Sequence, residues 1–415
     1  MPRSSTAVDH GRPRIRRRTS AAVGTVLVTG TLLASGAAAH AASWSSPAAP
    51  AHSRPHQPVM RKLTPEVRDR LDRALRDVLT TTRTPGVTVG LWAPGKGSYV
   101  RTLGTADKAT KAPMSPGFNM RVGSVTKTFT VTALLRLVDD RRVDLDDPIS
   151  RYVSGVPNGH RITLRHLAEM RSGLFNYLLD PGYGKAYMAD PRRVFSPHEM
   201  LAYSFKHPAG FPAGSRFEYS NTNTVLLAMV VQKVTGRPFD DYVARHVLKP
   251  AHLDHTFMPA GPEFPAPHAH GYTDQTADGS LQDATDRTPP GGPSGAMISN
   301  LRDLRSWASV LTGGSLLSPA TQAERMKFEP TGEPGLSYGL GIFANHGWLG
   351  HNGSLPGYQT VVIRLPEAGA TLVIHTTSDV ASQGKGPGTK FANAVTRIVT
   401  PGNVYDIPAP HPARS

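Results

Sequence analysis

Apolar residues recur every three or four positions in the segment that follows Thr64. They would share one face of a helix: Val67, Leu71, Ala74, Leu75, Val78 and Leu79. Thr64 belongs to the residue types that cap helix N-termini, and Pro65 suits the first helical position because its missing N–H is not needed there. The pattern therefore predicts a helix that begins at Pro65.

Strand-like apolar runs lie near both ends of the chain. Residues 86–91 and 98–103 are separated by the turn-forming segment Pro94-Gly95-Lys96-Gly97, so they predict a β-hairpin. Three more strands and a closing helix are predicted late in the chain, at 338–344, 360–365, 371–375 and 391–399.

The region from about 140 to 305 has short helical stretches and long connections rich in Pro and Gly. Helices are predicted at 163–170 and 224–234, and another precedes the region at 124–138. The first half of 124–138 is rich in Val and Thr, so packing rather than propensity must hold that helix. Strands at both ends with helices between them predict an α/β (α+β) fold with a helical insertion.

The N-terminus has the pattern of an export signal. Arginines at 14 and 16–18 precede an apolar run from Ala21 to Ala39 and the small-residue triplet Ala39-His40-Ala41. This arrangement predicts a signal peptide over 1–41, cut after Ala41, and a secreted, extracytoplasmic protein. An uncleaved membrane anchor is the alternative, and the arginines also favour twin-arginine export weakly.

Composition predicts the remaining boundaries. Residues 42–60 are mostly Ala, Ser, Pro and His with almost no aliphatic content, which is typical of a flexible linker. The main domain is expected over 61–400, with the helical insertion at about 140–305. Residues 401–415 are expected to form a loose tail.

Charge and cysteine content exclude several classes of protein. The 415-residue chain has no cysteine, which excludes disulfides, thiolate metal sites and a cysteine nucleophile. Its net charge is +15, of which +10 remains without residues 1–41. The basic residues are scattered and lack interleaved aromatics, so we expect no nucleic-acid partner. An anionic cell envelope is the partner that this charge favours, with no membrane contact after signal cleavage, and the protein is expected to be a monomer.

Ser124 and Lys127 form the first candidate for chemistry. Three residues apart at a helix start, their side chains share one face, and the helix N-terminus favours a developing oxyanion. A lysine can activate a serine only if its surroundings keep it neutral or let it relay a proton. The same spacing recurs at Ser382 and Lys385, in a glycine-rich segment that no helix can align. We interpret that second pair as a surface loop.

Two further segments carry polar groups that suit catalysis. Tyr219-Ser220-Asn221 supplies a phenol and an amide that can face one cleft, and a tyrosinate beside an ammonium could act as a base and then as an acid. His351-Asn352-Gly353-Ser354 lies between strand-like segments, where a glycine lets substrate approach and backbone N–H groups can form an oxyanion hole. Taken singly, a buried structural tyrosine and a turn histidine are the commoner interpretations.

These three motifs, in this order and roughly a hundred residues apart, resemble the motifs of the serine D-Ala-D-Ala carboxypeptidase and class C β-lactamase family. Three connecting segments also match the pattern of that family: Ile162–Leu167, Ser172-Gly173-Leu174 and Pro212-Ala213-Gly214. The resemblance covers about residues 64–399. The resemblance implies a β-lactamase/transpeptidase-like fold, in which helices flank an antiparallel sheet and an all-helical subdomain is inserted.

The same resemblance implies roles for individual residues. Ser124 would form the acyl-enzyme, Lys127 would assist its activation and Tyr219 would shuttle the proton. The substrate-binding group would be Asn221, which holds the substrate amide, together with Gly353 and Ser354, with the N–H groups of Ser124 and Ser354 as the oxyanion hole. His351 would occupy the place where β-lactamases carry a lysine, which favours the carboxypeptidase and its esterase or peptidase relatives.

Two departures from the family pattern concern the substrate. Carboxypeptidases of this type place an arginine on the strand before the third motif to bind a terminal carboxylate, whereas residues 338–350 contain no Arg or Lys. They also favour threonine on either side of the third-motif glycine, where this chain has Asn352 and Ser354. Recognition of a carboxylate by this chain is therefore in question.

Other sites are weaker. Gly339-Leu340-Gly341-Ile342-Phe343-Ala344 matches a dinucleotide fingerprint, but no helix is predicted after it. His268-Ala269-His270 with Asp274 fits no familiar metal-ligand spacing, so we expect an exposed loop, no metal and no cofactor. The sequence thus predicts a serine hydrolase acting on D-Ala-D-Ala peptides or β-lactams. An esterase or D-amino-acid peptidase of the same fold, or a silent envelope-binding homologue, stays open.

Overall fold

The computed structural model describes residues 60–407. The predicted signal peptide and residues 42–59 of the predicted linker lie outside this range. Met60, assigned from sequence to the linker, is buried in the core and belongs to the folded body.

An eight-stranded sheet forms the centre of the fold, and every neighbouring pair of its strands is antiparallel. In spatial order the strands are β2 (Gly97–Gly104), β1 (Gly86–Ala93), β12 (Ala370–Thr376), β11 (Tyr358–Leu365), β10 (Trp348–Leu355), β9 (Phe343–Asn345), β8 (Leu336–Tyr338) and β7 (Glu329–Pro330). The predicted hairpin is β1–β2, which confirms that prediction. The first and last parts of the chain meet where β1 pairs with β12.

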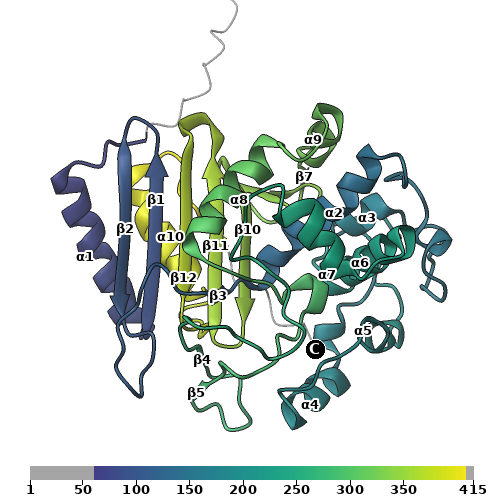
Figure 1. Cartoon of the computed structure of the whole chain (residues 1–415), viewed down its shortest axis with the longest axis horizontal. Coiled ribbons are helices and arrows are strands. Elements are labelled where there is room, and N and C mark those ends of the chain that lie inside the picture. The colour runs from purple at the N-terminus through teal and green to yellow at the C-terminus, as the bar shows by residue number, and fades with distance from the viewer. Residues whose placement is uncertain (1–59, 408–415) are drawn as a thin grey trace, which may run out of the picture. The chain divides into compact units, whose positions relative to one another are not determined.

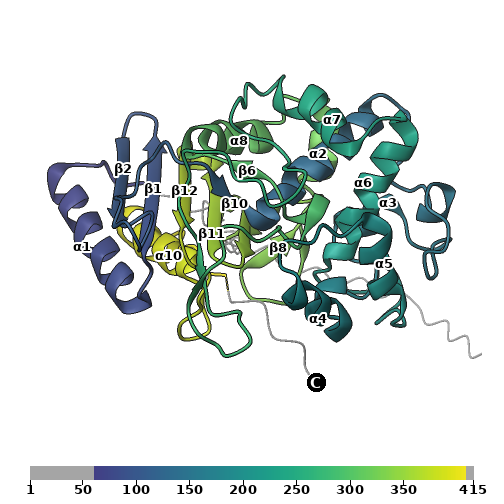
Figure 2. The same cartoon turned by 60° about the horizontal axis from the view of Figure 1, so that its bottom comes forward.

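Helices cover both faces of this sheet. On one face lie α1 (Pro65–Thr82) and α10 (Pro387–Val399), which pack against each other, and on the other lies α8 (Leu301–Gly313), which contacts β11 and β12 (Figures 1 and 2). Helix α1 begins as predicted, because the Thr64 hydroxyl accepts a hydrogen bond from the N–H of Val67 at 3.4 Å.

A helical lobe lies at the end of the sheet away from α1 (Figure 2). It contains α3 (Leu164–Ala168), α4 (Pro181–Ala189), α5 (Pro197–Phe205), α6 (Asn221–Thr235) and α7 (Phe239–Val243), and α9 (Pro319–Arg325) lies near β7 (Figure 1). The resemblance implied an all-helical inserted subdomain, but this region also contains three short strands. They are β4 (Tyr272–Thr273), β5 (Gln282–Asp283) and β6 (Ile298–Ser299). Of these, β6 pairs with β3 (Met120–Arg121), which precedes the insertion.

Helix α2 (Thr126–Asp139) joins the lobe to the sheet and is almost entirely buried. Phe129 stacks on Trp307 of α8 with ring centroids 4.0 Å apart, and the Trp307 indole N–H donates to the Thr128 hydroxyl at 2.8 Å. Tertiary packing therefore holds this Val- and Thr-rich helix, as its weak propensity required.

The predicted strand over 338–344 is two strands, β8 and β9, separated by a tight turn. Gly341 has φ +69°, and a Cβ there would lie 2.6 Å from the side chain of Val131, so the turn needs a glycine. The apolar run continues through the turn because these residues also face the core, which is why the sequence pattern did not show the break.

The beginning of the predicted loose tail is packed. Tyr405 is fully buried, the Trp348 indole N–H donates to the Asn403 carbonyl at 2.7 Å, and the Asp406 N–H donates to the Asn345 side chain at 2.9 Å. Residues 403–407 are thus packed against the folded body, with bonds to β9 and β10, and the loose-tail prediction is wrong for them.

Candidate active site

Ser124 lies where the folded body turns from β3 into α2. It occupies a single 3₁₀ turn, Gly123–Val125, which runs directly into α2. A Cβ on Gly123 would lie 2.8 Å from the Ser354 nitrogen, and one on Gly353 would lie 2.8 Å from the Ser124 nitrogen and 2.0 Å from the Val122 oxygen. Only glycine at both positions lets the backbones meet, so the N–H groups of Ser124 and Ser354 share one junction. Such a pair can serve as an oxyanion hole.

Lys127, in the first turn of α2, is completely buried. Its Nζ lies 2.9 Å from the Ser124 hydroxyl, 2.6 Å from the Asn221 side-chain oxygen and 2.7 Å from the Ser294 carbonyl oxygen. No carboxylate compensates for its burial, which lowers the pKa of Lys127 well below its usual range.

The three oxygens around Lys127 suit either charge state of its amine, because an ammonium would donate to all three. Burial favours the neutral amine. In that state the two carbonyl oxygens, which can only accept, take its two hydrogens, and its lone pair is left to accept the proton of the Ser124 hydroxyl. This pair therefore has the geometry of a nucleophile and its base.

Tyr219 precedes α6 and lies beside this pair. The Nζ of Lys127 is 4.9 Å from the centre of its ring, and its buried hydroxyl has no hydrogen-bond partner among the described residues. Burial raises the pKa of Tyr219, and the neighbouring Ser124 hydroxyl only partly opposes that rise. Burial thus favours the neutral form of both groups, rather than the tyrosinate beside an ammonium that the sequence raised as a possibility.

Asn221 is engaged within the protein. Its side-chain oxygen accepts from Lys127, and its Nδ2 donates to the Asn176 side-chain oxygen at 3.2 Å. An amide nitrogen carries two hydrogens, so one remains available to a substrate carbonyl. Asn221 thus orients the lysine first, and the substrate role implied by the resemblance rests on a single N–H.

His351 lies inside β10 and is 2 % exposed. Its Nδ1 lies 2.5 Å from the Asn352 carbonyl oxygen, which can only accept, so the ring donates from Nδ1 and its Nε2 accepts from the Tyr338 hydroxyl at 3.0 Å. Burial, and then repulsion from Lys127 when its amine is protonated, lower the pKa of His351 to about 3. His351 is therefore a neutral group whose ring lies 6.2 Å from that of Tyr219, and it brings no cation to the site.

The structure adds four residues to this site that the sequence reasoning missed: Asn176, Ser294, Tyr338 and Gln359. Asn176 lies two residues after the family-like segment Ser172-Gly173-Leu174, so its position was a usable signal. Tyr338 is the first residue of the 338–350 segment, in which only the lack of Arg and Lys was considered. Ser294 contributes a backbone carbonyl, for which a sequence carries no signal.

Gln359 pairs with Ser354 across β10 and β11. Its Oε1 accepts from the N–H of Gly388 at 3.0 Å, which orients its Nε2 to donate to the Ser354 hydroxyl oxygen at 3.3 Å. A Cβ on Gly386 would lie 2.2 Å from the Gln359 side chain, so a glycine makes room for this amide. Because Ser354 accepts from Gln359, its exposed hydroxyl is left to donate to a substrate.

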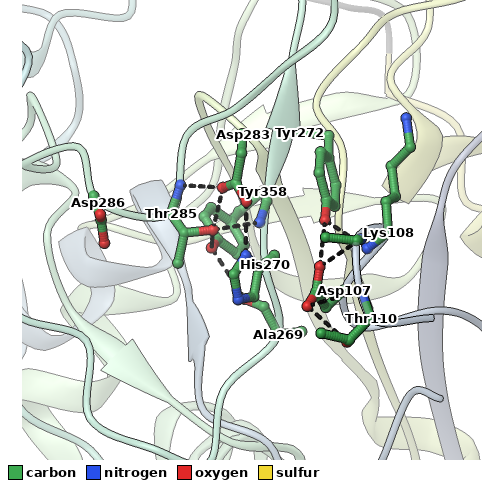
Figure 3. A network of polar contacts seen from close by, with 12 residues as sticks. Asp107, Lys108, Thr110, Ala269, His270, Tyr272, Asp283, Thr285, Asp286 and Tyr358 are labelled. Carbon is green, nitrogen blue, oxygen red and sulfur yellow. Dashed lines mark hydrogen bonds and ion pairs between the residues drawn. The ribbon is translucent and has the colours of Figure 1, made fainter. Parts of the chain in front are cut away.

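The weaker candidate segments of the sequence lie outside this site. Ser382 and Lys385 face each other in a backbone-paired turn, with the Lys385 ammonium on Asp406, so the loop interpretation is confirmed. The Nδ1 of His270 contacts the Asp283 carboxylate at 2.6 Å, beside Thr285 and Tyr358 (Figure 3). Across residues 60–407 no three His, Asp or Glu side chains gather as a metal site.

Comparisons with known proteins agree with this geometry. A sequence model described as Beta-lactamase matches residues 71–393. The chain is 26% identical over 279 residues to PbpX of Bacillus subtilis strain 168, named as a penicillin-binding protein, covering 66% of this chain and 65% of that one. The chain thus spans just under two thirds of that relative's length.

Two solved structures share the fold over nearly their whole length. A D-stereospecific amidohydrolase from Streptomyces sp. is 29% identical with a TM-score of 0.71, covering 79% of this chain and 98% of that one. A D-amino acid amidase from Ochrobactrum anthropi SV3 is 27% identical with a TM-score of 0.71, covering 80% and 97%. The fold is β-lactamase/transpeptidase-like, and because the family match extends over most of its length, the chain belongs to the Beta-lactamase family of hydrolases.

Proposed function

We propose that the protein is a secreted serine hydrolase that forms an acyl-enzyme on Ser124 and cleaves amide bonds of D-amino-acid amides and peptides. The observation that carries this proposal is the buried contact set of Lys127: burial favours the neutral amine, whose two hydrogens go to carbonyl oxygens and whose lone pair then faces the Ser124 hydroxyl. The likeness to two D-specific amidohydrolases supports the choice of substrate class.

In the acylation step, Lys127 takes the Ser124 proton as Oγ attacks the substrate carbonyl carbon. The negative charge that forms on the carbonyl oxygen is stabilised by the N–H groups of Ser124 and Ser354. Collapse breaks the C–N bond, and the proton held by Lys127 reaches the leaving nitrogen with the neutral Tyr219 hydroxyl as relay. Water then attacks the ester by the same route in reverse, and Ser124 regains its proton.

The polar groups at the end of β10 favour a substrate whose leaving group carries no carboxylate. In the part of the chain that the structure describes, no Arg or Lys side chain contacts Asn352, Ser354 or Gln359 by a hydrogen bond or ion pair. A hydroxyl and two amides bind carbonyl and carboxamide groups well, but they do not neutralise a carboxylate.

A second candidate substrate class is D-Ala-D-Ala peptides and β-lactams, which the likeness to PbpX favours. Esters remain a further candidate, because the acylation step does not depend on the leaving group being an amine. We also propose an extracytoplasmic location and an anionic envelope as surroundings. No helix between residues 60 and 407 is both long and apolar enough to span a membrane.

The test is a substrate panel with intact-mass detection of the acyl-enzyme. D-phenylalanine amide, its L enantiomer, a D-Ala-D-Ala peptide, a fluorescent penicillin and p-nitrophenyl acetate would be compared on the wild type, Ser124→Ala and Ser382→Ala. We expect D-selective amide turnover that is lost in Ser124→Ala and kept in Ser382→Ala, the matched control from the surface turn. Equal turnover by wild type and Ser124→Ala would refute the proposal.

A further inference from the structure

A second polar pocket lies on the α8 face of the sheet, apart from the catalytic residues. It has a volume of about 350 Å³. Its floor includes Trp92 on β1, Thr371 on β12 and Arg364 on β11, which are successive partners across the sheet. Arg305 and Ser309 of α8 form one wall. Arg364 pairs in turn with Leu349 on β10, so this row crosses the catalytic strand on the N-terminal side of His351.

The pocket is positively charged and lacks a compensating acid. Its lining contains Arg305 and Arg364 and no Asp or Glu. Within residues 60–407, neither arginine has a carboxylate partner, whereas most ion pairs of this region involve an arginine. The Cζ atom of Arg305 lies 4.8 Å from the centre of the Trp92 ring, and among the described residues Arg364 donates only to the Thr312 hydroxyl, at 3.4 Å.

The Arg364 guanidinium is also incompletely satisfied. Its Nε is buried and has no hydrogen-bond partner among the described residues. A buried charged donor without a partner costs free energy, so native proteins seldom leave one unless a ligand or water completes it. The bond from its Nη1 to the Thr312 hydroxyl restrains the guanidinium, which removes part of the ordering cost of binding.

We propose that this pocket binds a phosphate group. Two guanidinium groups supply forked N–H donors, and the hydroxyls of Ser98, Ser309 and Thr371 add further donors. This donor set surrounds a tetrahedral group with three or four oxygens better than a planar carboxylate with two. The group belongs to a free phosphate or monoester, or to a phosphodiester of an anionic polymer, since both present the same oxygens.

The experiment measures binding to the full chain by isothermal titration calorimetry at constant ionic strength. The probes are inorganic phosphate, glycerol 3-phosphate and glycerophosphoglycerol, with acetate as the planar control. The variants are Arg364→Gln, Arg305→Gln and the matched control Arg302→Gln, which lies on the same helix but does not line the pocket. Arg364→Lys keeps the positive charge but lacks the forked N–H donors of the guanidinium. It replaces Arg364→Gln in the experiment if that variant does not fold.

We expect one saturable phosphate site, weakened about tenfold or more in the Arg364 and Arg305 variants and unchanged in Arg302→Gln. A preference for the monoester or for the diester identifies the source, and either supports the proposal. Equal binding of acetate, equal loss in Arg302→Gln, or no saturable binding would overturn it. Ser124→Ala should bind phosphate like the wild type, so this result is independent of the proposed hydrolase activity.

Discussion

Replacing Asn221 by aspartate tests whether Lys127 acts as a neutral base. The substitution converts the carbonyl oxygen that lies 2.6 Å from the lysine Nζ into a carboxylate, with little change in shape. A carboxylate at that distance favours the ammonium, so it raises the pKa of Lys127. Less of the enzyme then holds the free amine that takes the Ser124 proton.

The size of the effect follows from the distance and the burial. Two charges 2.6 Å apart attract by about 6 kcal/mol at an effective dielectric constant of about 20. Burying the new carboxylate, which replaces a side chain only 7 % exposed, offsets much of this attraction. A net stabilisation of the ammonium by about 2 kcal/mol corresponds to about a thirtyfold loss of acylation rate at a pH where the wild-type lysine is itself protonated, and to a smaller loss at neutral pH.

The assay is the pH dependence of acylation, followed with p-nitrophenyl acetate from about pH 5 to 10. Because the base must be unprotonated, the acid limb of kcat/KM should move to higher pH in Asn221→Asp, and the rate should recover at high pH. Asn221→Ala removes the acceptor without adding charge, so its rate should fall without that upward shift. An acid limb that is unmoved in Asn221→Asp would refute the assignment of Lys127 as the neutral base.

Three further substitutions test the site. In the wild type the pKa of Lys127 is lowered by burial, so between that lowered pKa and pH about 10.5 the unfolded chain binds more protons, and stability should rise with pH through this range. Lys127→Met should remove about 1.4 kcal/mol per pH unit of that slope in denaturant unfolding; an unchanged slope would argue against a neutral lysine. Gly353→Ala places a methyl group 2.0 Å from the Val122 oxygen, so we expect about 2 kcal/mol or more of destabilisation and a large fall in kcat, whereas wild-type melting and turnover would contradict the close approach. Gln359→Glu keeps the bond from the Gly388 N–H, but the new carboxylate accepts from the Ser354 hydroxyl, which can then no longer donate to a substrate. We expect KM for amides to rise about tenfold while KM for p-nitrophenyl acetate stays unchanged. Equal effects on both substrates would count against this role of Gln359.

Local patterns in the sequence predicted much of the fold. Helix α1 and the β1–β2 hairpin follow from periodicity, a cap and a turn, all of which act over a few residues. The break between β8 and β9 and the packed segment 403–407 did not follow from local patterns, because each depends on residues distant in the chain. An apolar run signals burial, and burial alone does not show where a strand ends.

The same division holds for the site. The spacing of Ser124 and Lys127 determined their contact, since residues three apart at a helix start share a face, and the motif order was enough to suggest the family. The sequence could not decide which protonation states these groups have. Burial favours the neutral forms of Lys127, Tyr219 and His351, because tertiary packing removes water from the Lys127 amine, the Tyr219 hydroxyl and the His351 ring. Among the described residues, no carboxylate forms a hydrogen bond or ion pair with any of these groups. Burial is a property of the whole fold. The residues of the proposed catalytic pair could therefore be identified from the sequence, whereas the neutral state in which they would act as nucleophile and base depends on the tertiary structure.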